Sequence, residues 1–208
     1  MFNKTLAVAT LALLSQAAYA TAISNSTTGL ASPIVTITFD EHVLPAQSAV
    51  TSQYADLGVT FSPNLYYSSV IEDLPNITGN NVSNFNDDEK VSQFSLNFVT
   101  DQTDVAFAMV SDGSMWQFEA LLNNSIIDSF STSVDFSDLD FFGFTGITFD
   151  EIKITWIDDN LDDNFDNIVM TIDNLQLGNA ENVPEPAALA LLGMGMAGFA
   201  ARRRVKLA

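Results

Sequence analysis

Apolar side chains occupy every second position in several separate segments of this chain, which is the periodicity of a β-strand with one buried face. Helical periodicity is weak, and Asn, Asp, Ser and Gly residues, which favour turns, separate the segments. The alternating apolar positions are Val35, Ile37 and Phe39; Val105, Phe107 and Met109; Trp116, Phe118, Ala120 and Leu122; Ile152, Ile154 and Trp156; and Ile168, Met170 and Ile172. Strands at this spacing predict an all-β fold, an antiparallel β-sandwich or jelly roll.

Two features modify this simple pattern. After Ile172 the apolar set continues one residue late, at Leu175 and Leu177, which predicts a β-bulge at Asp173-Asn174. The stretch 74–90 is polar and rich in asparagine, and it is predicted to be a long surface loop.

The N-terminus has the three parts of a secretory signal peptide. Lys4 supplies a positive charge, and residues 6–14 form an apolar core. Small residues then offer two cleavage sites, Ala18-Tyr19-Ala20 and Ala20-Thr21-Ala22. We therefore expect an N-terminal signal helix within residues 1–22, which is removed during export.

The C-terminus combines a short rigid motif, an apolar run and a basic cluster. The two prolines of the motif keep the glutamate between them in an extended segment. The 15-residue apolar run 187–201 is shorter than the roughly 20 residues of a comfortable span, so we expect a transient membrane segment. The basic cluster is expected to hold its end on the cytoplasmic side. The motif is Val183, Pro184, Glu185 and Pro186, and the basic cluster is Arg202, Arg203 and Arg204.

This tail resembles the PEP-CTERM sorting signal of Gram-negative bacteria, with Pro184, Glu185 and Pro186 as its diagnostic triad. The resemblance implies recognition by an exosortase, a membrane processing enzyme, and removal of the tail near the motif. It also implies an organism that makes extracellular polysaccharide. The alternative is a surface protein that its uncut tail helix holds in the membrane.

The two signals leave about 160 residues, enough for one domain with its own core. We predict a signal peptide at 1–22, a polar leader at 23–32, a β-sandwich at 33–178, a linker at 179–183 and the sorting signal at 184–208.

The domain between the signals is strongly acidic. All 26 Asp and Glu residues lie between Asp40 and Glu185, whereas only Lys90 and Lys153 of the seven basic residues lie outside the two signals. Such a surface repels nucleic acid and anionic lipid, and it attracts divalent cations. Cysteine is absent, so no disulfide contributes to stability.

One acidic segment is a candidate calcium site. Calcium takes about 6–8 oxygen ligands, and a loop dense in Asp and Asn can supply them. The segment is not an EF-hand, because Asp163 stands where the turn glycine belongs and Val169 where the bidentate glutamate belongs. A solvated acidic hairpin loop is the alternative. The alternate positions that would bind the ion are Asp158, Asn160, Asp162, Asn164 and Asp166.

The start and end of the domain carry a second resemblance. The segments Thr38-Phe39-Asp40-Glu41 and 53–62, with Ile172-Asp173-Asn174-Leu175, are similar to exported jelly rolls of the carbohydrate-binding-module type. In a jelly roll the first and last strands often lie close, so Asp40 or Glu41 could share a structural calcium ion with Asp173. The alternative is that Asp40 is a turn residue and Asp173 part of the bulge.

Catalysis finds little support in the residue types. The chain has no cysteine and one histidine, His42, which lies near no nucleophile-elbow motif. A glycosidase needs two paired carboxylates, and Glu119 is the acid of most interest, but it faces away from Trp116 and is predicted to be solvated. We predict that the protein is not an enzyme.

Aromatic rings could form a sugar-binding platform, since they stack on the apolar faces of sugars. Tyr66 and Tyr67, between Pro63 and Pro75, are predicted to be exposed in a loop and are the weak ligand-binding candidates. Trp116 and Trp156 are predicted to belong to the core.

Together these features predict an exported, non-catalytic surface or matrix protein for adhesion or polysaccharide association. The expected partners are the Sec export machinery, exosortase, the inner membrane in transit and extracellular polysaccharide, and nucleic acid is not expected. Calcium is the one expected cofactor. The alternative function is an extracellular polysaccharide-active enzyme of the glycosidase type.

Overall fold

The computed structural model describes residues 21–69, 74, 76–86, 91–138, 140–157 and 169–178. Within these ranges the protein is all-β, and its only helical element is the single 3-10 turn η1 (Ala55–Leu57). Every strand pairing is antiparallel, as the alternation predicts. No helix in the described ranges is long and apolar enough to cross a bilayer. The signal helix and the sorting helix that the sequence predicts lie outside these ranges.

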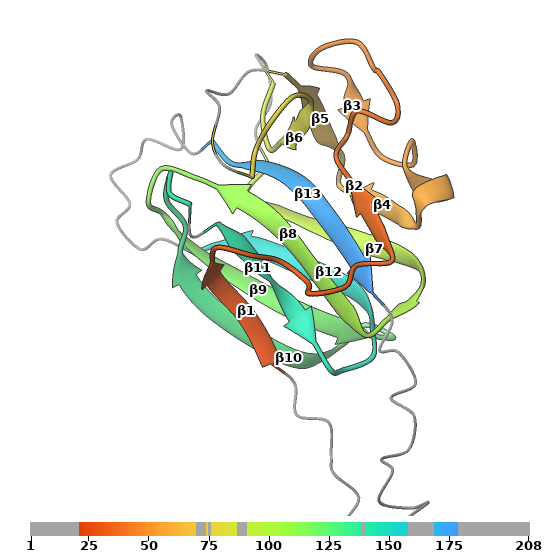
Figure 1. Cartoon of the computed structure of the whole chain (residues 1–208), viewed down its shortest axis with the longest axis vertical. Coiled ribbons are helices and arrows are strands. Elements are labelled where there is room, and N and C mark those ends of the chain that lie inside the picture. The colour runs from red at the N-terminus through yellow and green to blue at the C-terminus, as the bar shows by residue number, and fades with distance from the viewer. Residues whose placement is uncertain are drawn as a thin grey trace, which may run out of the picture.

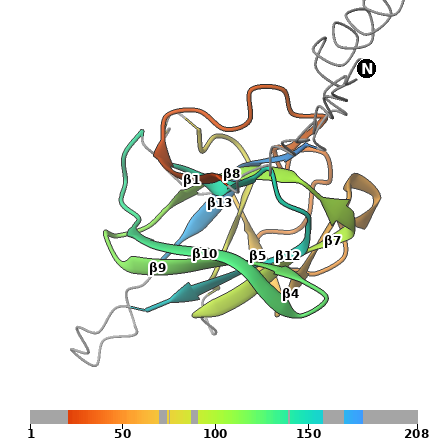
Figure 2. The ribbon, with the colours of Figure 1, turned by 90° about the horizontal axis from the view of Figure 1, so that it is seen from below.

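The strands form two sheets that pack face to face (Figures 1 and 2). The first sheet has the order β1 (Thr21–Ser26), β11 (Phe141–Thr145), β8 (Asp104–Val110), β13 (Thr171–Gly178), β6 (Asn81–Ser83), β5 (Leu65–Ser68) and β3 (Ala49–Val50), and β2 (Val35–Ile37) also pairs with β13. The second sheet has the order β10 (Ser125–Ser133), β9 (Met115–Leu122), β12 (Phe149–Trp156), β7 (Gln93–Gln102) and β4 (Val59–Ser62).

The main core lies between the sheets and confirms the predicted alternation. Phe107 and Met109 of β8, and Ile152 and Ile154 of β12, are fully buried in it. Phe118 of β9 stacks between two other rings, with centroid distances of 4.8 Å to Phe130 and 5.2 Å to Phe142. Trp116 is fully buried, as predicted, and Trp156 is partly buried against the core. Stacked rings from both sheets thus join the two layers.

The outer face of the first sheet carries a second apolar cluster that the alternation does not predict. Ala106, Ala108 and Val110 point away from the main core, yet all three are buried. Ile77 and the partly buried Leu74, from the stretch predicted to be a surface loop, pack in this cluster. Small side chains on β8 therefore let another part of the chain cover this face of the sheet.

Two expectations about loops are wrong. The Asn-rich stretch 74–90 contains β6, whose residues are all buried, so it is not simply a surface loop. The second is the Tyr66-Tyr67 loop, which is strand β5. In both cases the pairing of distant strands buries polar or irregular sequence. The first residues of the predicted polar leader at 23–32 lie in β1, in which Ile23 pairs with Gly143 of β11, and β1 is largely exposed.

The predicted bulge is confirmed. The register of β13 against β8 shifts between Asp173 and Gln176, and Asn174 has a positive φ of 47°. The extra residue returns Leu175 and Leu177 to the core face, on which Ile172 also lies.

Candidate functional site

The end of β2 and the middle of β13 meet at one corner of the first sheet. Figure 1 shows β2 running beside β13, and Ile37 pairs with Leu175. Just beyond that pair the chain continues into Asp40 and Glu41, while the bulge of β13 presents Asp173. We call Asp40, Glu41, Asp173 and the covering segment 76–80 the acidic corner.

Phe39 fixes the direction in which Asp40 and Glu41 leave the strand. It is fully buried and has a positive φ of 59°, which is unusual for a bulky residue. Its carbonyl oxygen accepts hydrogen bonds from the hydroxyls of Tyr54, at 3.0 Å, and Tyr67, at 3.2 Å. Burial raises the pKa of both tyrosines, so they remain neutral donors at ordinary pH. Two buried donors thus hold a strained turn whose next residues are acidic.

Backbone N–H groups hold the two aspartates. Asp173 accepts from the N–H of Thr78 at 2.9 Å through Oδ2, and from the N–H of Asn174 at 2.6 Å through Oδ1. Asp40 Oδ1 accepts from Asn80, at 3.2 Å from the backbone N–H and 2.5 Å from Nδ2. Gly79 lies directly against Asp40, since a Cβ there would be 2.9 Å from Oδ2. The segment 78–80 therefore wraps both carboxylates.

The corner concentrates negative charge, and Asp40 and Glu41 are exposed whereas Asp173 is buried. Asp173 is only 1% exposed. Burial raises its pKa to about 7. The hydrogen bonds from Thr78 and Asn174 lower this pKa, and the nearby charges of Asp40 and Glu41 raise it by smaller amounts. Among the described residues the only lysine or arginine is Lys153, and it pairs with Glu119 on the second sheet, with Nζ and Oε2 2.5 Å apart. The described part of the chain thus supplies no side-chain cation to the corner.

The donor set suits a hard cation. Each carboxylate oxygen of Asp173 accepts one N–H and keeps a further lone pair, and Asp40 Oδ2 faces the corner beside Gly79. In the described ranges no three His, Cys, Asp or Glu side chains converge as a ligand group. Calcium also accepts backbone and amide oxygens and water, and the 76–80 segment carries such oxygens. The residues therefore fit calcium only as a site of mixed ligands.

The buried charge leads to a prediction about pH. Since the folded-state pKa of Asp173 lies above the ordinary value of 3.8, its protonation stabilises the metal-free fold fully below about pH 4, and this contribution is lost as pH rises through about 7. The change is at most about 4 kcal/mol. In chelator, melting temperatures of the native protein should fall relative to those of Asp173→Asn between pH 5 and 8. Asp101→Asn, at an exposed position of β7, is the control and should follow the native protein. Parallel pH profiles for the native protein and Asp173→Asn would contradict this prediction.

The structure places the other predicted site residues differently. Tyr66 and Tyr67 are each 3% exposed in β5, so the prediction of exposed rings is wrong. Glu119 is 8% exposed and paired with Lys153, so it is not a solvated strand position. His42 is a loop residue whose Nε2 lies 3.1 Å from Asp56 Oδ1.

Two predicted sites lie outside the described residues. They are the calcium loop of Asp158, Asn160, Asp162, Asn164 and Asp166, and the sorting segment with Val183, Pro184, Glu185, Pro186 and Arg202, Arg203 and Arg204. Sequence reasoning paired Asp40 with Asp173 but missed Thr78, Gly79 and Asn80, which cover them. The Thr-Gly-Asn turn signature was the available signal.

The fold and the C-terminal segment together define a class of protein, a single β-domain followed by a sorting tail. The last strand ends at Gly178, and the family model for the PEP-CTERM protein-sorting motif matches residues 182–204. The chain therefore carries a PEP-CTERM protein-sorting motif. Its signal implies export through the membrane to the cell surface, with exosortase as the processing partner. No curated protein and no solved structure matches the chain.

Proposed function

We propose that this PEP-CTERM protein is a non-catalytic component of the surface or extracellular matrix of a Gram-negative bacterium. Sec machinery exports it, the tail enters the inner membrane in transit, and its β-sandwich then associates with matrix polysaccharide. The observation that carries the proposal is the order of parts, in which a closed β-domain ends at Gly178 directly before the sorting motif at 182–204. Such a chain delivers a folded module to the outside of the cell.

Two observations favour a non-catalytic module over a polysaccharide-active enzyme. The carboxylate of Glu119 is held by Lys153, and that of Glu151 accepts the hydroxyl of Ser95 at 2.5 Å. Both acids lie on strands of the second sheet, where each already has a structural partner. A glycosidase instead needs a pair of carboxylates directed at the bond to be cleaved.

We further propose that the acidic corner holds a structural calcium ion. Such an ion supplies positive charge between the carboxylates of the corner. The described part of the chain places no cationic side chain there. Asp40 follows the first core strand and Asp173 lies in the last, so binding there ties together the two ends of the domain. Stability would then depend on calcium, and folding and metal binding would be linked.

Polysaccharide association is tested by retention of the exported protein on the host's own matrix polysaccharide, with calcium and with chelator. We expect retention in calcium and reduced retention in chelator, with no shortening of the polysaccharide. Release of reducing ends would support the enzyme instead. Absence of retention in both conditions, for a protein shown to be folded, would contradict matrix association.

Calcium binding is tested separately by thermal unfolding. At a calcium concentration about 100 times the dissociation constant, the stabilisation is about 2.7 kcal/mol, which raises the melting temperature by about 5–10 °C. We expect Asp40→Asn and Asp173→Asn to lose this increase and Asp101→Asn to keep it. Asp162→Asn tests the other candidate loop, and loss of the increase there alone would move the site from the corner to that loop.

A further inference from the structure

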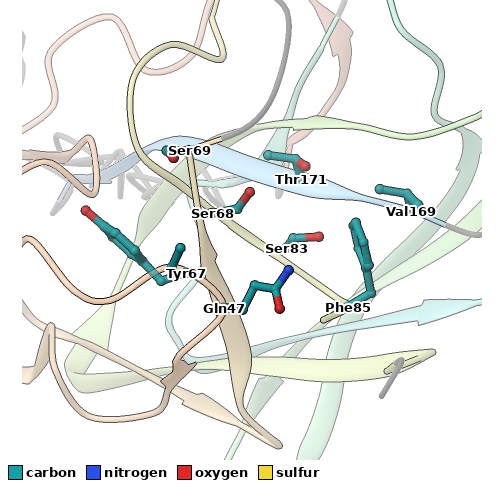
Figure 3. A pocket seen from close by; sticks show the side chains of 9 residues that line it. Gln47, Tyr67, Ser68, Ser69, Ser83, Phe85, Val169 and Thr171 are labelled. Carbon is teal, nitrogen blue, oxygen red and sulfur yellow. The ribbon is translucent and has the colours of Figure 1, made fainter. Parts of the chain in front are cut away.

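A pocket of about 300 Å³ opens on the outer face of the first sheet (Figure 3). Strands β5, β6 and β13 contribute its walls, and the turn before β3 closes one side. Its volume is at the lower end of the range for small-molecule sites, about 300–1,000 Å³. No residue named so far as part of the sorting motif or as a calcium ligand lines it.

The strand register explains why hydroxyl groups gather on the pocket floor. Thr171 of β13 pairs with Ser83 of β6, and the next pair, Ile172 with Val82, points into the main core. Since side chains alternate across a strand, Thr171 and Ser83 must face outward together. Ser68 of β5 and Ser69, which follows it, add two further hydroxyls, and Figure 3 shows all four around the same space.

Thr171 contributes a hydroxyl to the pocket floor. The residue is only 2% exposed, and it lines the pocket together with Ser83. The Ser83 hydroxyl donates to the carbonyl of Met170 at 2.9 Å. A polar group that lines a pocket is placed to bond to water or to a ligand.

The chemistry of the lining selects a neutral, hydroxylated ligand. All residues that line the pocket are uncharged, although the chain has a net charge of −19. Gln47 offers an amide, with the ring of Phe85 on one side of it and the ring of Tyr67 on the other (Figure 3). Hydroxyl and amide groups beside aromatic rings match a sugar, which has hydroxyls at its edge and an apolar face.

We propose that this pocket binds one neutral sugar unit of the matrix polysaccharide. This inference rests on the proposed association with polysaccharide and names the part of the surface that would carry it. The surrounding negative charge disfavours uronic acids and other anionic units. Contact with sugar therefore involves Thr171, Gln47 and Phe85.

The test is saturation-transfer NMR on the exported protein, purified from its host in a detergent without a sugar headgroup. The probes are methyl glycosides of glucose, galactose and mannose, with glucuronate as the charged comparison. We expect at least one neutral glycoside to bind with a millimolar dissociation constant, and glucuronate to bind at least about tenfold more weakly.

Two variants probe the site and one serves as the control. Thr171→Val removes the floor hydroxyl at constant shape, and Gln47→Gly removes the rim amide at a backbone position with a φ of 61°, which glycine adopts without strain. Both should weaken binding of the neutral glycoside about five- to tenfold, since a lost hydrogen bond costs about 1–1.5 kcal/mol. Thr155→Val, on the second sheet, should bind as the native protein does. Melting temperatures confirm that each variant is folded.

The outcomes separate this inference from the function on which it rests. If no neutral glycoside binds at about 50 mM, or if both pocket variants bind as the native protein does, the pocket is not a sugar site. If the native protein and both variants are nevertheless retained equally on the matrix polysaccharide, the proposed function stands and another surface carries it. If the native protein neither binds a neutral glycoside nor is retained on the matrix polysaccharide, both the sugar pocket and the proposed function are overturned.

Discussion

Replacing Glu185 with alanine is expected to leave the sorting tail attached to the exported protein. Glu185 lies between two prolines within the matched motif at 182–204. Alanine removes its carboxylate but keeps both prolines. If exosortase reads that carboxylate, processing stops, and the apolar run with its arginine cluster keeps the protein in the membrane fraction.

Intact mass and membrane fractionation of the exported protein measure this effect. The native protein should be found without the tail, and the Glu185→Ala protein should keep its full C-terminus in the membrane. Glu181→Ala is the matched control, because Glu181 lies one residue before the matched segment and should not affect processing. If the native protein keeps its tail, the result would instead support the alternative that the uncut tail holds a surface protein in the membrane.

Replacing Gly143 with alanine is expected to destabilise the whole β-domain. Gly143 lies in β11 with a φ of 154°, and a Cβ there would be 2.0 Å from the carbonyl oxygen of Val105 in the adjacent strand. The backbone of β8 cannot move aside as a flexible side chain could, because β8 also pairs with β13. Strain at the positive φ and displacement of a packed strand each cost about 1–3 kcal/mol.

Together these costs, about 2–6 kcal/mol, are a large fraction of the 5–15 kcal/mol that stabilises a typical domain. For a domain of this size the melting temperature should fall by about 5–20 °C. Gly113→Ala is the matched control, since Gly113 also has a positive φ, of 93°, but a Cβ there would meet no atom within 4 Å. It should cost only about 1–2 kcal/mol. Equal melting temperatures for the two variants would show that β11 and β8 do not approach as closely as described.

The strands were predictable because their signal is local. Alternation in segments such as 105–109 and 152–156 indicates which residues share a face of the sheet. The one-residue shift of the apolar positions after Ile172 indicates where β13 must bulge. Both are properties of a few consecutive residues. The buried Ala106 and Ala108 were not predictable in the same way, because alternation does not say what covers the second face of a sheet.

The candidate sites were predictable only in part. The second resemblance brought Asp40 and Asp173 together, and the structure places them in the same corner, but the segment that donates to both carboxylates was predicted to be surface loop. Tyr66 and Tyr67 were predicted to be exposed because prolines flank them, whereas pairing with Ser83 and Val82 of β6 buries both. The pocket hydroxyls come from strands far apart in the chain, so no sequence window contains them.

The sequence alone determined the strand pattern, the acidic domain and the sorting tail. Each of these is a property of the residue types along the chain, and it does not depend on how distant segments pack. Only the tertiary structure decided which carboxylates share a corner, which tyrosines are buried and which hydroxyls line a pocket. Those properties depend on strand order and register, and these are set by long-range pairing and by packing of two whole sheets.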